Sequence, residues 1–214
     1  MLFWINGTDF DYVDVYAMGI NSEQYMFSYT DSGYVKKDDW TDVDPNKFIK
    51  EIKENYKASN EVRKNNGQPY VTNVTWKKKP YLDGIYNSVY YALDVSWSDN
   101  TSSVEGTSII LGREGYTTGK YIGGDNGYSE QMLLNTSKIH KFNSTKEYKD
   151  WKSGDKVAAA GIGALLATTL GVKALKPGII AAGLLLLKKF WFIIFLPFIW
   201  LGNLFKGSGK KKKK

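Results

Sequence analysis

A long apolar stretch near the C-terminus constrains this chain more than any other feature. Residues 154–205 are largely apolar, with Asp155 and a few lysines as their charged residues, and residues 190–205 carry no charge. As a helix at ~1.5 Å per residue, that last segment is about 24 Å long, at the short end of what crosses a bilayer core. A buried helix of a globular domain rarely holds so many consecutive apolar residues. We therefore predict a C-terminal transmembrane helical anchor.

The residues that flank this segment are typical of a membrane interface. Trp191 and Trp200 lie near its two ends, where amphipathic rings prefer the level of the lipid headgroups. Lys188 and Lys189 precede the segment and Lys206 follows it, so their ammonium groups can extend toward water. We assign these five residues to the membrane anchor.

An earlier apolar segment, residues 157–172, contains small side chains at every fourth position. Ala159, Gly163, Ala167 and Gly171 fall on one face of a helix. Such a face allows close helix packing in lipid, as in a helical hairpin or a homodimer, although the same residues would also keep a weakly hydrophobic helix flexible. The number of crossings therefore stays open between one span and a two-helix hairpin.

Charge divides the chain at the same place. Residues 1–150 have a net charge of −4, whereas residues 151–214 have 12 lysines against Asp155 alone and a net charge of +11. Because the basic character belongs to the anchor, we expect no nucleic-acid partner. The lysines at 210–214 favour the cytoplasmic side. We predict a soluble domain at 1–150, an anchor at 151–206 and a lysine-rich tail at 207–214.

The first 150 residues are long enough to bury a core, and their pattern predicts an α+β domain. Asp44 at an N-cap position and Pro45 at the first helical position begin a helix that runs to about Asn65. Alternating apolar residues predict strands at 11–16, 24–29, 70–76, 85–97, 104–111 and 116–122, and a short helix is expected at 129–142. This order favours an antiparallel sheet packed by one or two helices.

Residues suited to catalysis are scarce. The chain has no cysteine and one histidine, His140, so thiolate chemistry, a His-based metal site and a Ser-His-Asp triad all lack support. Residues 31–44 hold five aspartates, but their spacing differs from that of a calcium-binding EF-hand. We therefore expect a non-enzymatic domain with no catalytic, cofactor-binding or metal-binding residues and no cofactor.

Four segments resemble, in their order and spacing, a family of uncharacterised proteins. They are DSGYVKKDD at 31–39, ASNEVRKNNG at 58–67, LGREG at 111–115 and KEYKDWKSGDKVAAAGIGAL at 146–165. From about Gln24 to Phe205 the chain is similar to bacterial membrane-anchored proteins classed as a domain of unknown function, some with a predicted link to amylopullulanase regulation. The resemblance implies a domain outside the cytoplasm, an N-terminal signal and a C-terminal anchor. This sequence has no recognisable signal peptide, which leaves the completeness of its N-terminus open.

The sequence supports two functions. We favour a membrane-anchored, non-enzymatic domain that is presented at the cell envelope, with the lysine tail in the cytoplasm. Its expected partners are the lipid bilayer and a protein, ligand or second copy of the chain, the last through the small-residue helix face.

The alternative function is a carbohydrate-binding or carbohydrate-acting envelope protein. A carbohydrate-acting site would use carboxylates such as Asp31, Asp38 or Asp39. A carbohydrate-binding site would use an aromatic platform that includes Trp40, Trp76 and Trp97. Filling a small core is the simpler explanation of those tryptophans.

Overall fold

A computed structural model of the chain describes residues 15–18 and 24–172. The predicted anchor residues Trp191, Trp200, Lys188, Lys189 and Lys206, together with the lysine tail, lie outside the described residues. Among the residues that are described, no helix is long and apolar enough to cross a membrane.

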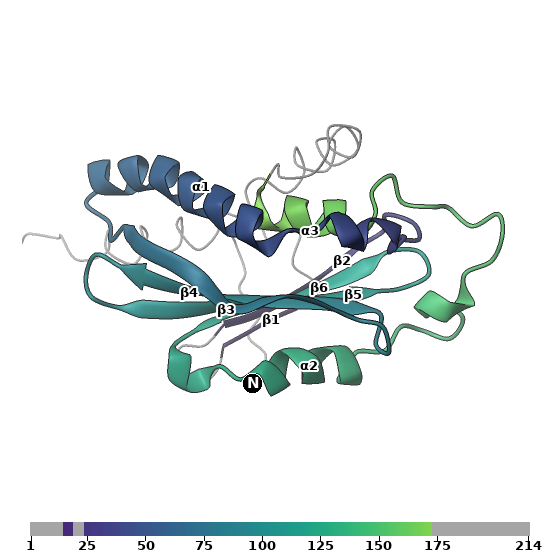
Figure 1. The fold of residues 1–214 in the computed structure, drawn as a ribbon. Helices are drawn as coiled ribbons and strands as arrows, with labels where there is room; N and C mark the ends of the chain where they lie inside the picture. The colour runs from purple at the N-terminus through teal and green to yellow at the C-terminus, as the bar shows by residue number, and fades with distance from the viewer. Residues whose placement is uncertain (1–14, 19–23, 173–214) are drawn as a thin grey trace, which may run out of the picture.

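A six-stranded antiparallel sheet forms the centre of the described fold (Figure 1). Its strands lie in the order β1-β2-β6-β5-β4-β3. They are β1 (Val15–Met18), β2 (Gln24–Thr30), β3 (Val71–Asp83), β4 (Ser88–Trp97), β5 (Ser102–Leu111) and β6 (Tyr116–Gly123). The prediction of an α+β fold with an antiparallel sheet is confirmed.

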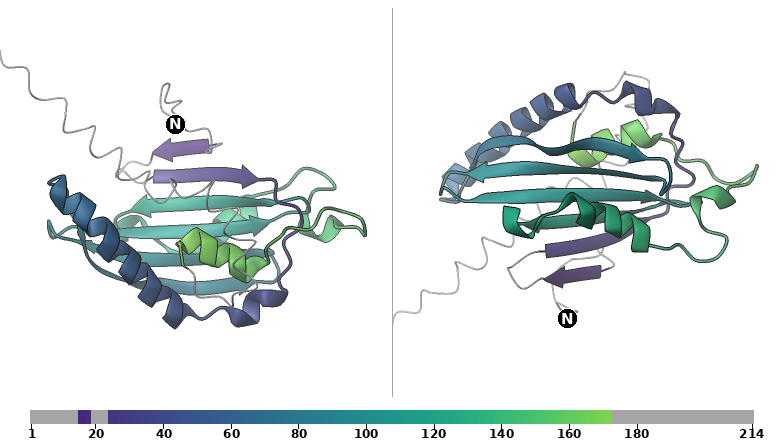
Figure 2. Two further views of the ribbon diagram at one scale, coloured as in Figure 1. Left: turned by 90° about the horizontal axis from the view of Figure 1, so that it is seen from above. Right: turned by 60° about the horizontal axis from the view of Figure 1, so that its bottom comes forward.

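Helices cover both faces of this sheet. Helices α1 (Pro45–Asn65) and α3 (Ile162–Leu170) lie on one face, and α2 (Glu130–Ile139) lies on the other (Figures 1 and 2). Three short 3-10 helices complete the described elements: η1 (Asp38–Asp42), η2 (Asp125–Gly127) and η3 (Tyr148–Asp150).

The beginning of α1 follows from local sequence signals. The Asp44 side chain accepts hydrogen bonds from the backbone N–H groups of Asn46 and Lys47, and Pro45 occupies the first helical position. Phe48 and Ile52 are buried against the sheet, one turn apart. The predicted helix is confirmed in position and length.

The core consists of two clusters, one on each face of the sheet. The larger cluster joins the sheet to α1 and α3 and includes Val89, Ile109 and Leu166, each with less than 1% of its surface exposed. The smaller cluster packs Leu133 of α2 against the opposite face. Gly106 makes room there, because a Cβ atom at that position would lie 2.9 Å from a Leu133 methyl group.

Strand β3 is longer than the sequence pattern predicts. It continues through Lys77, Lys78, Lys79 and Pro80 to Asp83, and no other described strand pairs with its outer side. An edge position tolerates lysines and a proline because one row of backbone groups needs no partner strand. The turn to β4 therefore falls at 84–87, and β4 begins at Ser88.

Part of the segment that the sequence assigns to the anchor packs into the core of the described fold. Helix α3 lies within the segment assigned to the anchor, yet Ile162, Leu165 and Leu166 belong to the larger core cluster. The apolar character of residues 162–167 therefore serves packing against the sheet and α1. The domain continues to the last described residue, Val172, which is also buried.

Candidate functional site

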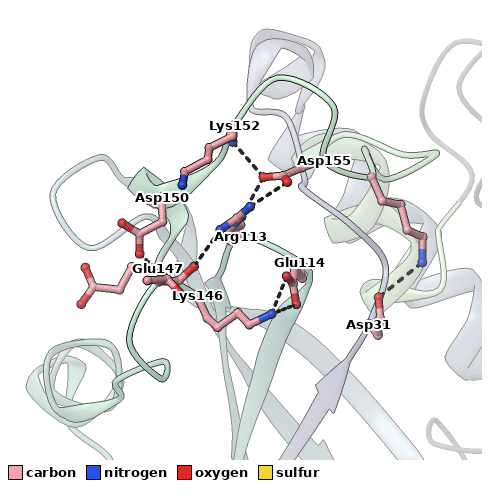
Figure 3. A network of polar contacts seen from close by, with 10 residues as sticks. Asp31, Arg113, Glu114, Lys146, Glu147, Asp150, Lys152 and Asp155 are labelled. Carbon is pink, nitrogen blue, oxygen red and sulfur yellow. Dashed lines mark hydrogen bonds and ion pairs between the residues drawn. The ribbon is translucent and has the colours of Figure 1, made fainter.

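Three of the four segments that carry the family resemblance meet at one end of the sheet. We name this region the motif end and define it by residues 31–39, 84–87, 111–115 and 140–161. These segments include the β3–β4 turn, the β5–β6 turn, the chain that follows β2 and the long connection between α2 and α3. Figure 3 shows a network of polar contacts among some of its charged side chains.

Backbone hydrogen bonds hold these segments together. The Gly33 N–H donates to the Glu114 carbonyl at 2.7 Å, and the Tyr34 N–H donates to the Lys156 carbonyl at 2.8 Å. The Tyr34 carbonyl in turn accepts from the Ala158 N–H at 2.9 Å. Gly33 has a φ of +89°, and a Cβ atom there would lie 2.8 Å from the Lys156 carbonyl oxygen. Only glycine fits this close approach.

Arg113 links the β5–β6 turn to the connection before α3. Its guanidinium forms a bidentate ion pair with Asp155 at 2.7 and 2.8 Å, and it also donates to the Thr145 carbonyl at 3.2 Å (Figure 3). Asp155 accepts a further bond from the Lys152 N–H. The hydrogen bond from Arg113, followed by that from Lys152, lowers the pKa of Asp155 to about 2. The pair therefore stays ionised at physiological pH.

Two further ion pairs lie beside this one. Lys146 donates to both carboxylate oxygens of Glu114, and Lys156 lies 3.3 Å from Asp31 (Figure 3). Both pairs are exposed to solvent, so each contributes little to stability. They place charges of both signs at fixed positions around the motif end.

Aromatic rings stack beside the charged residues. Tyr34 and Tyr148 are stacked with ring centroids 4.4 Å apart, and Trp151 lies 5.2 Å from Tyr34. The Tyr148 hydroxyl donates to the Val35 carbonyl at 2.8 Å, while the Lys37 ammonium lies 4.7 Å from the Tyr148 ring centre. Burial first, and then its bond with Tyr34, raise the pKa of Tyr148. Tyr148 is thus an uncharged structural residue, whereas Trp151 is 39% exposed.

Asp39 connects the motif end to α3. Its two carboxylate oxygens accept hydrogen bonds from the N–H groups of Gly163 and Ala164 at 2.9 and 3.0 Å. A Cβ atom at Gly161 would lie 2.5 Å from the Asp39 carboxylate, and one at Gly163 would lie 2.7 Å from its backbone oxygen. Asp39 therefore satisfies two N–H groups in the first turn of α3, and the two glycines allow it to approach.

The four small residues predicted for helix packing have different roles. Gly163 and Ala167 are buried within α3. Ala159 is exposed before the helix begins, and Gly171 ends it in a left-handed conformation with a φ of +69°. These positions do not form one continuous face on α3.

A protein-family model described as "Protein of unknown function (DUF2167)" matches residues 15–199. The chain belongs to this family. The match includes all segments of the motif end, and the description assigns no activity to the family. No curated protein and no solved structure matches the chain.

In this DUF2167 domain, the three candidate carboxylates have different surroundings. Asp31 pairs with Lys156, and Asp39 binds the beginning of α3. Asp38 is exposed in the first turn of η1. Within the described ranges, no group of three His, Cys, Asp or Glu residues is arranged to hold a metal ion.

The three candidate tryptophans pack against the core of the DUF2167 domain. The Trp76 indole donates to the Pro45 carbonyl at 3.0 Å, and the Trp97 indole donates to Ser103 Oγ at 3.1 Å. Trp40 also packs against the larger core cluster. The exposed aromatic residue of the motif end is Trp151. It lies in the segment 146–165 that carries the family resemblance. That position is the sequence feature by which Trp151 could have been identified as a candidate site residue.

The single histidine is also a packing residue in this DUF2167 domain. His140 contacts the Phe142 ring edge to face, with centroids 4.6 Å apart. Burial lowers its pKa below the ordinary value, so it is neutral at pH 7. Phe142 in turn packs over Gly112, where a Cβ atom would lie 2.8 Å from the ring.

Proposed function

We propose that this chain is a membrane-tethered, non-enzymatic member of the DUF2167 family that binds a partner or ligand through the motif end at the cell envelope. The observation that carries the proposal is the distribution of exposed apolar side chains. Of the six large hydrophobic residues exposed in the described part of the chain, five lie at or beside the motif end, and only Val62 of α1 lies elsewhere. The five are Tyr29, Tyr81, Ile85, Trp151 and Val157.

A concentration of exposed apolar residues rimmed by polar groups marks an interaction surface. Ile85, at the β3–β4 turn, is 83% exposed although nothing in turn geometry requires an isoleucine there. The turn itself is held by Asp83, which accepts hydrogen bonds from the N–H groups of Ile85 and Tyr86. The apolar side chain is therefore presented on a fixed turn.

The carboxylates at the motif end support a non-enzymatic function. A general acid needs a raised pKa, but the pKa of Asp155 is lowered by Arg113. Asp39 is bonded to backbone N–H groups, and Asp150 accepts from the Glu147 N–H. Each of these three carboxylates therefore holds chain segments together. No two of them face each other across an open site.

The proposed tether is tested by labelling a chain that contains no cysteine. Ser102→Cys places a thiol at the exposed start of β5, and Ser208→Cys places one in the tail. With a membrane-impermeant maleimide on intact cells, we expect labelling at position 102 and none at 208. Labelling at neither position until the cells are broken would contradict an external domain.

Binding through the motif end is tested by photo-crosslinking in cells. A photoreactive amino acid replaces Ile85, and the matched control replaces Val62, which is 62% exposed on α1. We expect a specific crosslinked product, to lipid or protein, from position 85 and none from position 62. Equal crosslinking from both positions would contradict binding at the motif end.

A second candidate function is carbohydrate binding, and the exposed ring of Trp151 over Tyr34 favours it. An exposed aromatic face can stack against a sugar ring. Retention of the chain on immobilised starch or pullulan, lost in Trp151→Ala, is the expected result. No retention of the unaltered chain would eliminate this candidate.

A further inference from the structure

At the motif end, more basic than acidic side chains are exposed to solvent. Seven lysines at or next to it are exposed, against three exposed acids. The lysines are Lys36, Lys138, Lys141, Lys146, Lys149, Lys152 and Lys156, and the acids are Asp31, Asp38 and Glu147. The surface that meets solvent is therefore more basic than its composition indicates.

The remaining acids of the motif end are less exposed than these lysines or are paired with one of them. Asp39, Asp150 and Asp155 are only partly exposed. The Glu114 side chain is about as exposed as that of its partner Lys146, at 44% and 45%. Asp39 and Asp150 accept backbone N–H bonds, while Asp155 faces Arg113. Lys146, Lys149 and Lys156 each pair with an acid, and the other exposed lysines add to them, so the excess of lysines determines the sign of the outer surface. This charge is complementary to an anionic partner.

The basic surface coincides with the exposed aromatic and aliphatic residues. Trp151 and Val157 belong to the same connection as five of the lysines, and the nearby Ile85 occupies the tip of the β3–β4 turn. Lys37 connects that turn to the aromatic stack, because its ammonium donates to Asn87 at 2.9 Å and lies over Tyr148. Lysines next to Trp, Tyr and aliphatic side chains are the combination that favours a bilayer interface with anionic headgroups.

We propose that the motif end binds the surface of an anionic lipid bilayer, with Ile85 and Trp151 at the headgroup level and the exposed lysines on the phosphates. The inference rests on the proposed tether, which keeps the domain close to a membrane at high effective concentration. Weak contacts are then sufficient to orient the domain. Each lysine close to an anionic surface strengthens such binding roughly fivefold.

The experiment uses the full chain in lipid nanodiscs. Single cysteines at Ile85 and, as control, at Val62 carry an environment-sensitive fluorophore, and an aqueous quencher reports their exposure. In nanodiscs that contain phosphatidylglycerol we expect several-fold less quenching at position 85 than at position 62. We expect this protection to decrease in pure phosphatidylcholine and in high salt, which screens exposed charges.

A charge variant separates lipid binding from a change in folding. Lys36→Gln, Lys141→Gln and Lys152→Gln together should restore quenching at position 85. The matched control removes three exposed lysines of α1, Lys53, Lys57 and Lys64, and should leave the protection unchanged.

Two results would overturn the lipid inference. Equal quenching at positions 85 and 62 in anionic nanodiscs is the first. Protection of position 85 only in native membrane vesicles is the second, because it identifies a protein partner; the proposed binding function would then stand without the lipid. Absence of protection in both preparations would remove binding at the motif end as well.

Discussion

The carboxylate of Asp39 binds the first turn of α3 through the N–H groups of Gly163 and Ala164, which lie 124 and 125 residues further along the chain. This contact ties a motif near the beginning of the domain to α3, a helix within the segment that the sequence assigns to the anchor. Next to it, the Ile162 N–H donates to the Lys36 carbonyl at 2.8 Å. The position of α3, and thus the exit of the chain from the described domain, depends on the motif end.

Asp39→Ala is expected to destabilise the domain. It removes the acceptor for two N–H groups at a helix end, a loss that typically costs about 1 to 2 kcal/mol. Chemical denaturation of the purified chain measures the change. The neighbouring variant Asp38→Ala is the control, since Asp38 is exposed, and it should stay within roughly 0.5 kcal/mol of the original. Equal effects of the two substitutions would contradict the capping role.

Gly163→Ala should also destabilise, although alanine is normally the better helix former. The added Cβ atom would lie 2.7 Å from the Asp39 carbonyl oxygen, so η1 would have to move away from α3. Overpacking of this kind costs roughly 1 to 3 kcal/mol. Gly84→Ala is the control, because nothing lies within 4 Å of a Cβ atom at that position. A Gly163→Ala substitution that leaves the free energy of unfolding unchanged would contradict the close contact between Asp39 and Gly163.

The ion pair between Arg113 and Asp155 predicts a dependence of stability on pH. The pKa of Asp155 is about 2 in the fold against an ordinary value of 3.8, so the charged carboxylate favours the folded state. This contribution is fully present above about pH 4 and is lost as the pH falls toward 2. Asp155→Asn should therefore lower stability at pH 7 and make progressively less difference below pH 4.

A double-mutant cycle that combines Asp155→Asn with Arg113→Gln tests whether the effect comes from this ion pair. We expect a coupling between the two substitutions at pH 7 that disappears near pH 2. Additive effects at pH 7 would show that the two residues act independently. Denaturation curves across the pH range provide the measurement.

Features with local signals were predictable from the sequence. Helix α1 follows from Asp44, Pro45 and the spacing of Phe48 and Ile52, which all act within a few residues. Strands β4 and β5 follow from alternating apolar residues separated by a polar turn. The second half of β3 could not be predicted from apolar alternation, because it contains three lysines. An edge strand tolerates such residues.

Features that depend on distant partners were not predictable. An uncharged run such as residues 162–167 has the same composition in a buried helix as in a membrane helix. What distinguishes α3 is Asp39, which fills the space over Gly161 and Gly163. The convergence of the motif segments likewise depends on contacts such as Arg113 with Asp155, 42 residues apart. A single sequence contains no record of such pairs.

Trp151 and Trp76 should respond differently to truncation, and this contrast separates surface from core aromatics. Trp76 is packed edge to face on Tyr91 with centroids 6.1 Å apart and donates to the Pro45 carbonyl, so Trp76→Ala should cost about 3 to 5 kcal/mol. Trp151 is 39% exposed and contacts Tyr34 on one side, so Trp151→Ala should cost about 1 kcal/mol or less.

The same pair distinguishes a binding role from a structural one. We expect Trp151→Ala to weaken crosslinking from position 85 in cells while the domain stays folded by circular dichroism. Conservative replacement by Trp151→Phe should restore part of the crosslinking, because an aromatic ring is retained over Tyr34. If Trp151→Ala unfolds the domain as strongly as Trp76→Ala, its ring is a structural support of the motif end, and its exposure has no bearing on binding.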